Sequence, residues 1–102
     1  MAEVIYEDQG AAPAAFNLYD KDKKIGEMIV ELNDGNLKVY HTEVDDDKAG
    51  KGYAKNLLEA MAAYSRENNL KVIPLCTYVA LQFKRHPDEY ADIWNQDVEP
   101  KF

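Results

Sequence analysis

The change in hydrophobic period through the middle of the chain constrains the fold more than any other feature of the sequence. Apolar and polar side chains alternate over residues 37–44, which is typical of a strand. From Ala54 onward, apolar residues recur at helical spacing for about four turns, which predicts an amphipathic helix. A short apolar run over residues 70–75 then predicts a strand buried on both faces. Strand, helix and strand joined by short loops form a βαβ unit, in which the two strands lie parallel with a right-handed crossover.

The sequence before this unit predicts antiparallel strands over residues 15–19 and 25–32. Residues 33–36, Asn-Asp-Gly-Asn, predict a hairpin turn, because Asp-Gly tolerates the positive φ angles of tight turns. On the returning strand, strict alternation predicts one face formed by Leu37, Val39, His41 and Glu43 and the other formed by Lys38, Tyr40, Thr42 and Val44.

The predicted fold class is therefore α+β: a mixed, mainly antiparallel sheet with one parallel strand pair and flanking helices. Residues 1–102 are expected to form a single domain with its core over about residues 16–94. The first fourteen residues lack periodicity and are expected to form a short edge strand or a loose tail. Thr77 is expected to cap a second helix, which runs to about Arg85 and which Pro87 stops.

Composition excludes several classes of partner. The net charge of −7 argues against a long nucleic acid, since such binding depends on lysines and arginines that contact phosphates. No segment has the length of apolar sequence that crosses a membrane. A single cysteine and a start without the features of a secretion signal favour the cytoplasm. Two histidines and one cysteine, scattered as they are, predict no metal site.

The loop between the first parallel strand and the helix is a candidate anion site. It contains Gly50 and Gly52 among three lysines at positions 48, 51 and 55. Glycines allow the backbone to approach a ligand closely, and the N–H groups of a helix N-terminus point at negative charge. The loop has neither the spacing of a P-loop nor that of a dinucleotide fingerprint.

Cys76 follows directly after the second parallel strand. Because parallel strands end at the same edge of a sheet, the glycine loop and Cys76 are expected to lie close together. A helix N-terminus at Cys76 would lower the pKa of the thiol, which favours thiol chemistry there. The alternative is a buried cysteine that behaves as a small apolar side chain.

Residues 50–54, Gly-Lys-Gly-Tyr-Ala, resemble the coenzyme A pyrophosphate loop of the GCN5-related N-acetyltransferases. The wider run is similar to the small yjdJ-type branch of that family over about residues 16–94. The segments that carry this resemblance are His41-Thr42-Glu43-Val44, the glycine loop, Pro74-Leu75-Cys76-x-Tyr78-Val79 and His86-Pro87.

The resemblance implies that the parallel strands splay apart and that acetyl-CoA enters the gap between them. The backbone amides of the loop would then hold the pyrophosphate at the helix N-terminus, with lysines adding positive charge. Backbone N–H groups near Leu75 and Thr77 would stabilise the oxyanion. The residues expected to bind the coenzyme are Val44, Gly50, Lys51, Gly52, Tyr53, Ala54, Lys55, Cys76 and Lys84.

The chain also departs from the family pattern. Ala49 stands where the loop usually begins with Gln or Arg, and Cys76 stands where the family has Asn. Phe83 occupies the place of the Tyr that protonates the leaving thiolate, so the usual acid is missing. The helices and last strands that enclose the acceptor in longer members are lacking as well.

The expected reaction is acetyl transfer from acetyl-CoA to an amine whose identity the sequence leaves open. Cys76 is the candidate for thiol chemistry, as acyl carrier, acid or partner in a mixed disulfide. Glu43 is the candidate base, and His41 is a weaker candidate on the same predicted face. The alternatives are a coenzyme A binding module without catalysis and a protein-interaction domain that retains only the fold. The protein is expected to be a monomer or a weak dimer.

Overall fold

The computed structural model describes residues 2–8, 10, 13–45 and 52–96. These residues contain one five-stranded sheet with the strand order β1-β2-β3-β4-β5. The strands are β1 (Ala2–Glu7), β2 (Ala14–Asp20), β3 (Lys23–Asn33), β4 (Asn36–Val44) and β5 (Lys71–Pro74), and the helices are α1 (Tyr53–Glu67), α2 (Thr77–Arg85) and α3 (Pro87–Tyr90).

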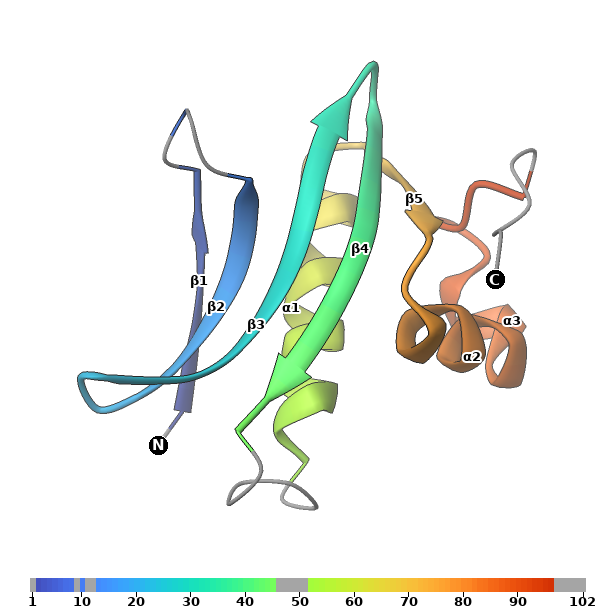
Figure 1. The fold of residues 1–102 in the computed structure, drawn as a ribbon. Helices are drawn as coiled ribbons and strands as arrows, with labels where there is room; N and C mark the ends of the chain where they lie inside the picture. The colour runs from blue at the N-terminus through green and yellow to red at the C-terminus, as the bar shows by residue number, and fades with distance from the viewer. Residues whose placement is uncertain (1, 9, 11–12, 46–51, 97–102) are drawn as a thin grey trace.

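The strand pairing confirms the predicted fold class. Strands β1 to β4 pair antiparallel with their neighbours, and β4 pairs with β5 in parallel. Figure 1 shows α1 crossing behind β3 and β4, while α2 and α3 lie beyond β5. The βαβ unit formed by β4, α1 and β5 is therefore present, and the segment at the N-terminus is an edge strand.

The β3–β4 hairpin follows from its turn residues. Asp34 and Gly35 have φ angles of 52° and 80°, and two consecutive residues with positive φ make the tight turn that matches the twist of the flanking strands. The turn allows β3 to run for 11 residues, which is longer than either of its neighbours.

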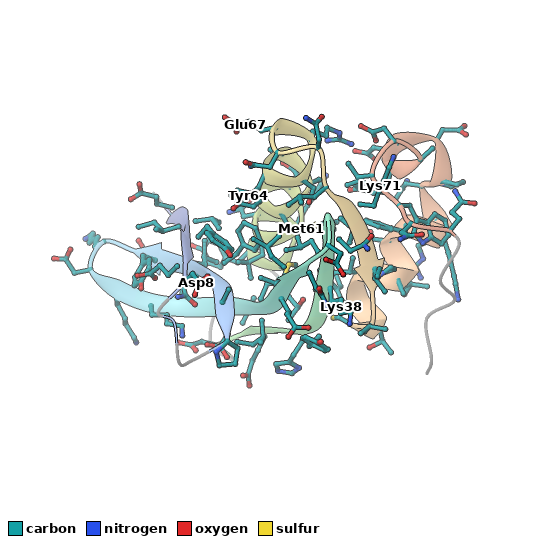
Figure 2. All side chains as sticks on the ribbon, turned by 90° about the horizontal axis from the view of Figure 1, so that it is seen from above. Asp8, Lys38, Met61, Tyr64, Glu67 and Lys71 are labelled. Atoms are coloured by element: carbon teal, nitrogen blue, oxygen red, sulfur yellow. The ribbon has the colours of Figure 1, made fainter. Side chains whose placement is uncertain are left out.

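Helix α1 covers one face of the sheet because its apolar residues share one stripe. Figure 2 shows the labelled Met61 and Tyr64 between α1 and the strands. Asn69 ends the helical segment with a φ of 56°, the left-handed conformation predicted for this position. The buried residues of α1 are Leu57, Leu58, Met61, Ala62 and Ser65, and they pack on sheet residues that include Phe16, Leu18, Met28, Val30, Leu37 and Val39.

A β-bulge in β4 makes one prediction wrong. Val39 pairs with Val30 and His41 pairs with Ile29, so Tyr40 is an extra residue on β4. An extra residue reverses the alternation beyond it. Thr42 therefore lies opposite the fully buried Met28, on the same face as Val39. His41 and Glu43 lie on the opposite, outer face, and not beside Leu37 and Val39 as strict alternation predicted.

Candidate functional site

The parallel strands separate after a short ladder. In the part of the chain that the structure describes, β5 pairs only with residues 36–39 of β4. The N–H of Leu75 donates to the carbonyl of Val39 at 3.0 Å, and α2 begins two residues later. Strand β4 continues to Val44 beside no described partner on that side. The result is an open strand edge between β4 and the start of α2 (Figure 1).

The backbone of β4 offers hydrogen-bonding groups at this open edge. The N–H of Asp45 donates to the carbonyl of Ile25 on the other side, at 2.8 Å. Backbone groups alternate in direction along a strand. The N–H and C=O groups of Thr42 and Val44 therefore point away from β3, along the edge of β4 that is not paired with β5.

Cys76 lies on the α2 side of the gap. It is the N-cap residue of α2, with extended backbone angles, and it occupies the capping position that was predicted for Thr77. Its side chain is only 7% exposed. The Sγ atom lies 3.3 Å from the hydroxyl oxygen of Thr42, to which it donates a hydrogen bond. The thiol is thus held against the strand whose edge is open.

The first turn of α2 adds donors next to the thiol. The N–H of Ala80 is the first that donates to the carbonyl of Cys76, at 3.0 Å. The amides of residues 77–79 precede it and have no acceptor within the helix. The N–H of Leu75, in contrast, donates to the carbonyl of Val39 at 3.0 Å, so it is not free to take the oxyanion role expected near Leu75.

Helix α1 begins at the other side of the gap. Gly52 is its N-cap residue with a φ of 79°, a left-handed conformation that glycine adopts without strain. None of the described side chains caps this end, and its first turn carries no acidic residue. The N–H of Asn56 donates to the carbonyl of Gly52 at 3.1 Å, and the amides of residues 53–55 precede this first helical hydrogen bond between described residues.

Besides Gly52, Cys76 and Lys84, the predicted coenzyme-binding residues fall into three groups. Val44 and Tyr53 are half-buried and pack against the core cluster that contains Cys76, and Ala54 follows in the first turn of α1. Lys55 is exposed and forms an ion pair with Glu59 at 3.8 Å. Gly50 and Lys51 lie outside the described residues, as do Lys48 and Ala49.

Lys84 is not placed beside this group. It lies in the last turn of α2, eight residues after Cys76, which corresponds to about 12 Å along the helix axis. The structure therefore brings together the start of α1, the end of β4 and the start of α2, with Lys84 at the far end of α2.

The two predicted acid–base residues lie on the outer face of β4. The Nε2 atom of His41 is 3.7 Å from Oε2 of Glu43, and their side chains are 59% and 68% exposed. Thr42, which contacts Cys76, points to the opposite face. Cys76 and Glu43 therefore flank β4 from its two sides, so a thioester in the gap would have the thiol on one side and the carboxylate on the other.

Phe83 cannot transfer a proton because its side chain has no ionisable group, and its surroundings are those of a core residue. Its ring is fully buried, stacks on Tyr90 with a centroid distance of 4.7 Å and meets Trp94 edge-on at 5.7 Å. Tyr78 is a different case. Burial raises the pKa of its phenol, and the neighbouring thiol of Cys76 and the carboxylate of Glu59 add to the shift. Its phenol keeps its proton at neutral pH.

The sequence patterns predict no functional role for Thr42 or Tyr78. Both occur within the segments that carry the family resemblance, His41-Thr42-Glu43-Val44 and Pro74-Leu75-Cys76-x-Tyr78-Val79. The hydrogen bond between Cys76 and Thr42 joins residues that are 34 positions apart, which spacing along the chain does not reveal. The resemblance was the signal that could have identified them.

The described residues contain no group of three or more His, Cys, Asp and Glu side chains arranged to hold a metal ion. None of the described helices combines the length and the apolar character needed to cross a membrane.

The open strand pair with a helix start on either side is the arrangement of an acetyltransferase fold, and the comparisons identify the family. Residues 15–93 match the family of GCN5-related N-acetyltransferases, and the chain belongs to this family. Comparison with curated proteins finds no match.

Solved structures agree with this assignment. A GCN5-like candidate N-acetyltransferase from Staphylococcus aureus is 29% identical, with a TM-score of 0.61, over 90% of this chain and 86% of that one. A ribosomal-protein-alanine N-acetyltransferase from Brucella melitensis biovar Abortus shares the fold at 22% identity and a TM-score of 0.61, over 92% and 72%. A candidate acetyltransferase of unknown function from meticillin-resistant Staphylococcus aureus shares it at 16% identity and a TM-score of 0.57, over 100% and 98%.

Proposed function

We propose that this chain binds acetyl-CoA between β4 and β5 and transfers the acetyl group to an amine. The observation that supports this most is the separation of the two strands beyond Val39, with the uncapped start of α1 on one side and Cys76 on the other. Membership of the family supports the reaction class, and the open edge of β4 supports the proposed position of the substrate.

In this proposal the phosphates of acetyl-CoA lie at the start of α1, and the rest of the molecule extends from there along β4. The amides of residues 53–55 would donate to the pyrophosphate, because a helix N-terminus combines free N–H groups with a partial positive charge. Gly50, Lys51 and Lys55 are proposed to complete this subsite. The pantetheine arm, which carries amide groups, would lie along the backbone of Thr42 and Val44. Lys84 stays a weaker candidate for a more distant phosphate.

The transfer requires an attack and two proton movements. The amine nitrogen attacks the thioester carbonyl carbon, a C–N bond forms, and the C–S bond breaks. The nitrogen gives up one proton, for which Glu43 is the candidate acceptor, directly or through water, with His41 as a weaker candidate. The sulfur of coenzyme A leaves as a thiolate and takes up one proton. The N–H of Thr77 would stabilise the oxyanion between these steps.

Cys76 is the proposed centre of the thiol chemistry. Its Sγ atom lies at the helix start that the acetyl group would approach, and Thr42 accepts its hydrogen bond. It would protonate the leaving thiolate, or accept the acetyl group first by exchange of one thioester for another. Tyr78 offers a second protonated group close to Cys76. Phe83, which stands in the usual position of the acid, has no proton to donate.

Three finer assignments belong to this proposal. The chain is proposed to belong to the yjdJ-type branch of the family, on the resemblance of residues 41–44 and 74–79. A single cysteine fits a reducing compartment such as the cytoplasm. A monomer or a weak dimer is expected in solution.

A coenzyme A binding module without catalysis is the second candidate function. The buried Phe83 favours it, because the family's usual acid is absent from that position. An interaction domain that retains only the fold is the third, and it predicts no effect of coenzyme A at all.

Calorimetry with acetyl-CoA and coenzyme A, followed by turnover assays over a broad panel of amines, separates the three functions. Binding with acetylated product supports the transferase. Binding without product, unaffected by Cys76→Ala, supports the binding module. If millimolar coenzyme A changes neither the heat of titration nor the melting temperature, both coenzyme functions fail and the interaction domain remains.

A further inference from the structure

The gap between β4 and the start of α2 is closed at one end and along one face. At that end, where the β4–β5 ladder stops, the N–H of Leu75 donates to the carbonyl of Val39 at 3.0 Å. Along the inner face, which α1 covers, the Sγ atom of Cys76 meets the hydroxyl of Thr42 at 3.3 Å. On the outer face the side chain of Glu43 is 68% exposed, and none of the described helices covers it (Figure 1). An amine would therefore approach the gap from the outer face.

The four groups around the reacting carbon give the acyl chain a direction. In the proposed reaction this carbon carries the sulfur, the oxygen, the attacking nitrogen and the acyl chain. The sulfur extends back along β4 toward the start of α1, and the nitrogen enters from the outer face beside Glu43. The oxygen points to the N–H of Thr77 at the start of α2. The direction left for the acyl chain leads toward Val39 and Thr42, at the closed end of the gap.

The closed end has little room for a longer chain. Thr42 is half-buried, so part of its side chain forms the surface of the gap, and it lies opposite Met28 on β3. Cys76 belongs to the same core cluster as Val39 and Val79. Met28, Val39 and Val79 are fully buried. Because protein cores are close-packed, an added methylene has to displace side chains that are already in contact.

We propose that the side chain of Thr42 limits the acyl group of the donor to two carbons, so that the protein selects acetyl-CoA over propionyl-CoA and butyryl-CoA. Thr42 sets this limit by its volume, because its two branches at Cβ fill the space between β4 and Cys76. The assignment rests on the proposed function, since it concerns the donor of the same reaction.

Calorimetric titration of the full chain with coenzyme A and its acetyl, propionyl and butyryl thioesters tests the limit without an acceptor. Coenzyme A and acetyl-CoA should bind with similar Kd values. One added methylene in a closed apolar site changes discrimination by about tenfold or more. Propionyl-CoA should therefore bind about tenfold more weakly than acetyl-CoA, and butyryl-CoA more weakly still.

Thr42→Ala is the variant that should extend the range of donors. It removes both branches at Cβ, so the Kd for propionyl-CoA should come within about threefold of the Kd for acetyl-CoA. The Kd for coenzyme A, which has no acyl group, should stay as in the unchanged protein. Thr42→Ser removes only the methyl group and should give an intermediate preference, and it provides the same test if Thr42→Ala does not fold.

Thr42→Val is the matched control, because it keeps the volume of the side chain and removes the hydroxyl that accepts the hydrogen bond from Cys76. This variant should keep the preference for acetyl-CoA. If it loses the preference as Thr42→Ala does, the assignment to side-chain volume is overturned.

Coenzyme A is the reference ligand that separates the possible failures. If coenzyme A does not bind, the proposed function and the acyl limit both fail. If coenzyme A binds and the unchanged protein binds butyryl-CoA as tightly as acetyl-CoA, the acyl limit is overturned and the proposed function stands. A Thr42→Ala variant that binds coenzyme A normally and keeps the tenfold preference overturns the role of Thr42.

Discussion

The surroundings of Cys76, the single cysteine of the chain, differ from those of a surface cysteine. It is 7% exposed, caps α2 and donates to the hydroxyl of Thr42. Burial alone would be consistent with a small structural side chain. The hydrogen bond and the open edge of β4 next to it give the thiol a defined position at the proposed thioester site.

Replacing Cys76 by alanine tests its role. The small apolar side chain fits the buried site, so the fold should survive, and coenzyme A binding should change little. Loss of the thiol should lower kcat/KM about 100-fold if Cys76 moves a proton or carries the acetyl group. Intact-mass measurement after incubation with acetyl-CoA shows whether the acetyl group becomes attached to the unchanged protein.

Thr42→Val is the matched control for this experiment. It keeps the volume of the side chain but removes the oxygen that accepts the Cys76 hydrogen bond. A smaller loss of activity than in Cys76→Ala is expected, because the thiol remains. Equal activity of Cys76→Ala and the unchanged protein would remove Cys76 from the mechanism.

At the scale of elements, the site is made by the places at which regular structure stops. The bulge at Tyr40 reverses the faces of the β4 residues that follow it, and β5 ends at Pro74. Helix α1 begins at Gly52 and α2 begins after Cys76, so the amides at both helix starts are available to a ligand. Each of these breaks leaves polar groups that a ligand would satisfy.

The start of α1 gives a prediction that does not depend on catalysis. Gly52 has a φ of 79°, and a Cβ added there would meet nothing within 4 Å. Gly52→Ala is therefore expected to lower the free energy of unfolding through backbone strain alone, by about 1 to 2 kcal/mol. Urea denaturation followed by circular dichroism measures the change.

Asparagine at the same position provides the comparison. It tolerates the left-handed conformation better than alanine, so Gly52→Asn should be destabilised less. If both variants are as stable as the unchanged protein, the left-handed conformation of Gly52 is not required for the start of α1.

At the scale of the whole molecule, the segment after α3 is tied to the centre of the fold. Trp94 forms a parallel bridge to Val72, so this segment lies along the edge of β5 that β4 does not occupy. Arg66 at the end of α1 donates to Asp92 at 2.7 Å and to the carbonyl of Glu89 at 2.8 Å. These contacts tie α3 and the segment that follows it to β5 and to the end of α1.

The Arg66–Asp92 pair gives a prediction on pH. The hydrogen bond from Arg66 lowers the pKa of Asp92 below its ordinary value of 3.8. A lowered pKa in the folded protein stabilises it above the ordinary pKa, and this contribution is lost as the pH falls through the lowered value. Because both side chains are more than a third exposed, Arg66→Met should cost about 0.5 kcal/mol near neutral pH.

Urea denaturation near neutral pH and below the ordinary pKa of Asp92 checks this. The difference between Arg66→Met and the unchanged protein should shrink in acid by the part that Asp92 contributes, and the contact with Glu89 should persist. Asp92→Asn serves as the control, since it removes the titrating group. A stability difference that is the same at both pH values would contradict the assigned ion pair.

Much of the fold was predictable because it depends on local patterns. The hairpin at Asp34 and Gly35, the helix from about Ala54 and the buried strand before Cys76 follow from turn residues and periodicity, and the structure confirms them. The parallel pairing followed from connection lengths. The convergence of the glycine loop with Cys76 stays a prediction as far as Gly50 and Lys51 are concerned, since they lie outside the described residues.

The faces of β4 were not predictable in the same way. Periodicity assumes an unbroken strand, whereas the bulge at Tyr40 arises from the pairing of β4 with β3. That single extra residue moves Thr42 toward Cys76 and sends Glu43 and His41 to the outer face. It also lets Tyr40 donate a hydrogen bond to Glu31 at 2.9 Å.

Periodicity and turn residues are enough to specify the fold class, the βαβ unit and a glycine-rich helix start, because each depends on short-range preferences that neighbouring residues share. Which side chains meet depends on the folded arrangement of distant segments. The contact of Cys76 with Thr42, the burial of Phe83 among aromatic rings and the separation of β5 from β4 depend on pairing and packing between distant segments. No local pattern encodes those contacts, since one inserted residue in a strand moves every following side chain to the other face of the sheet.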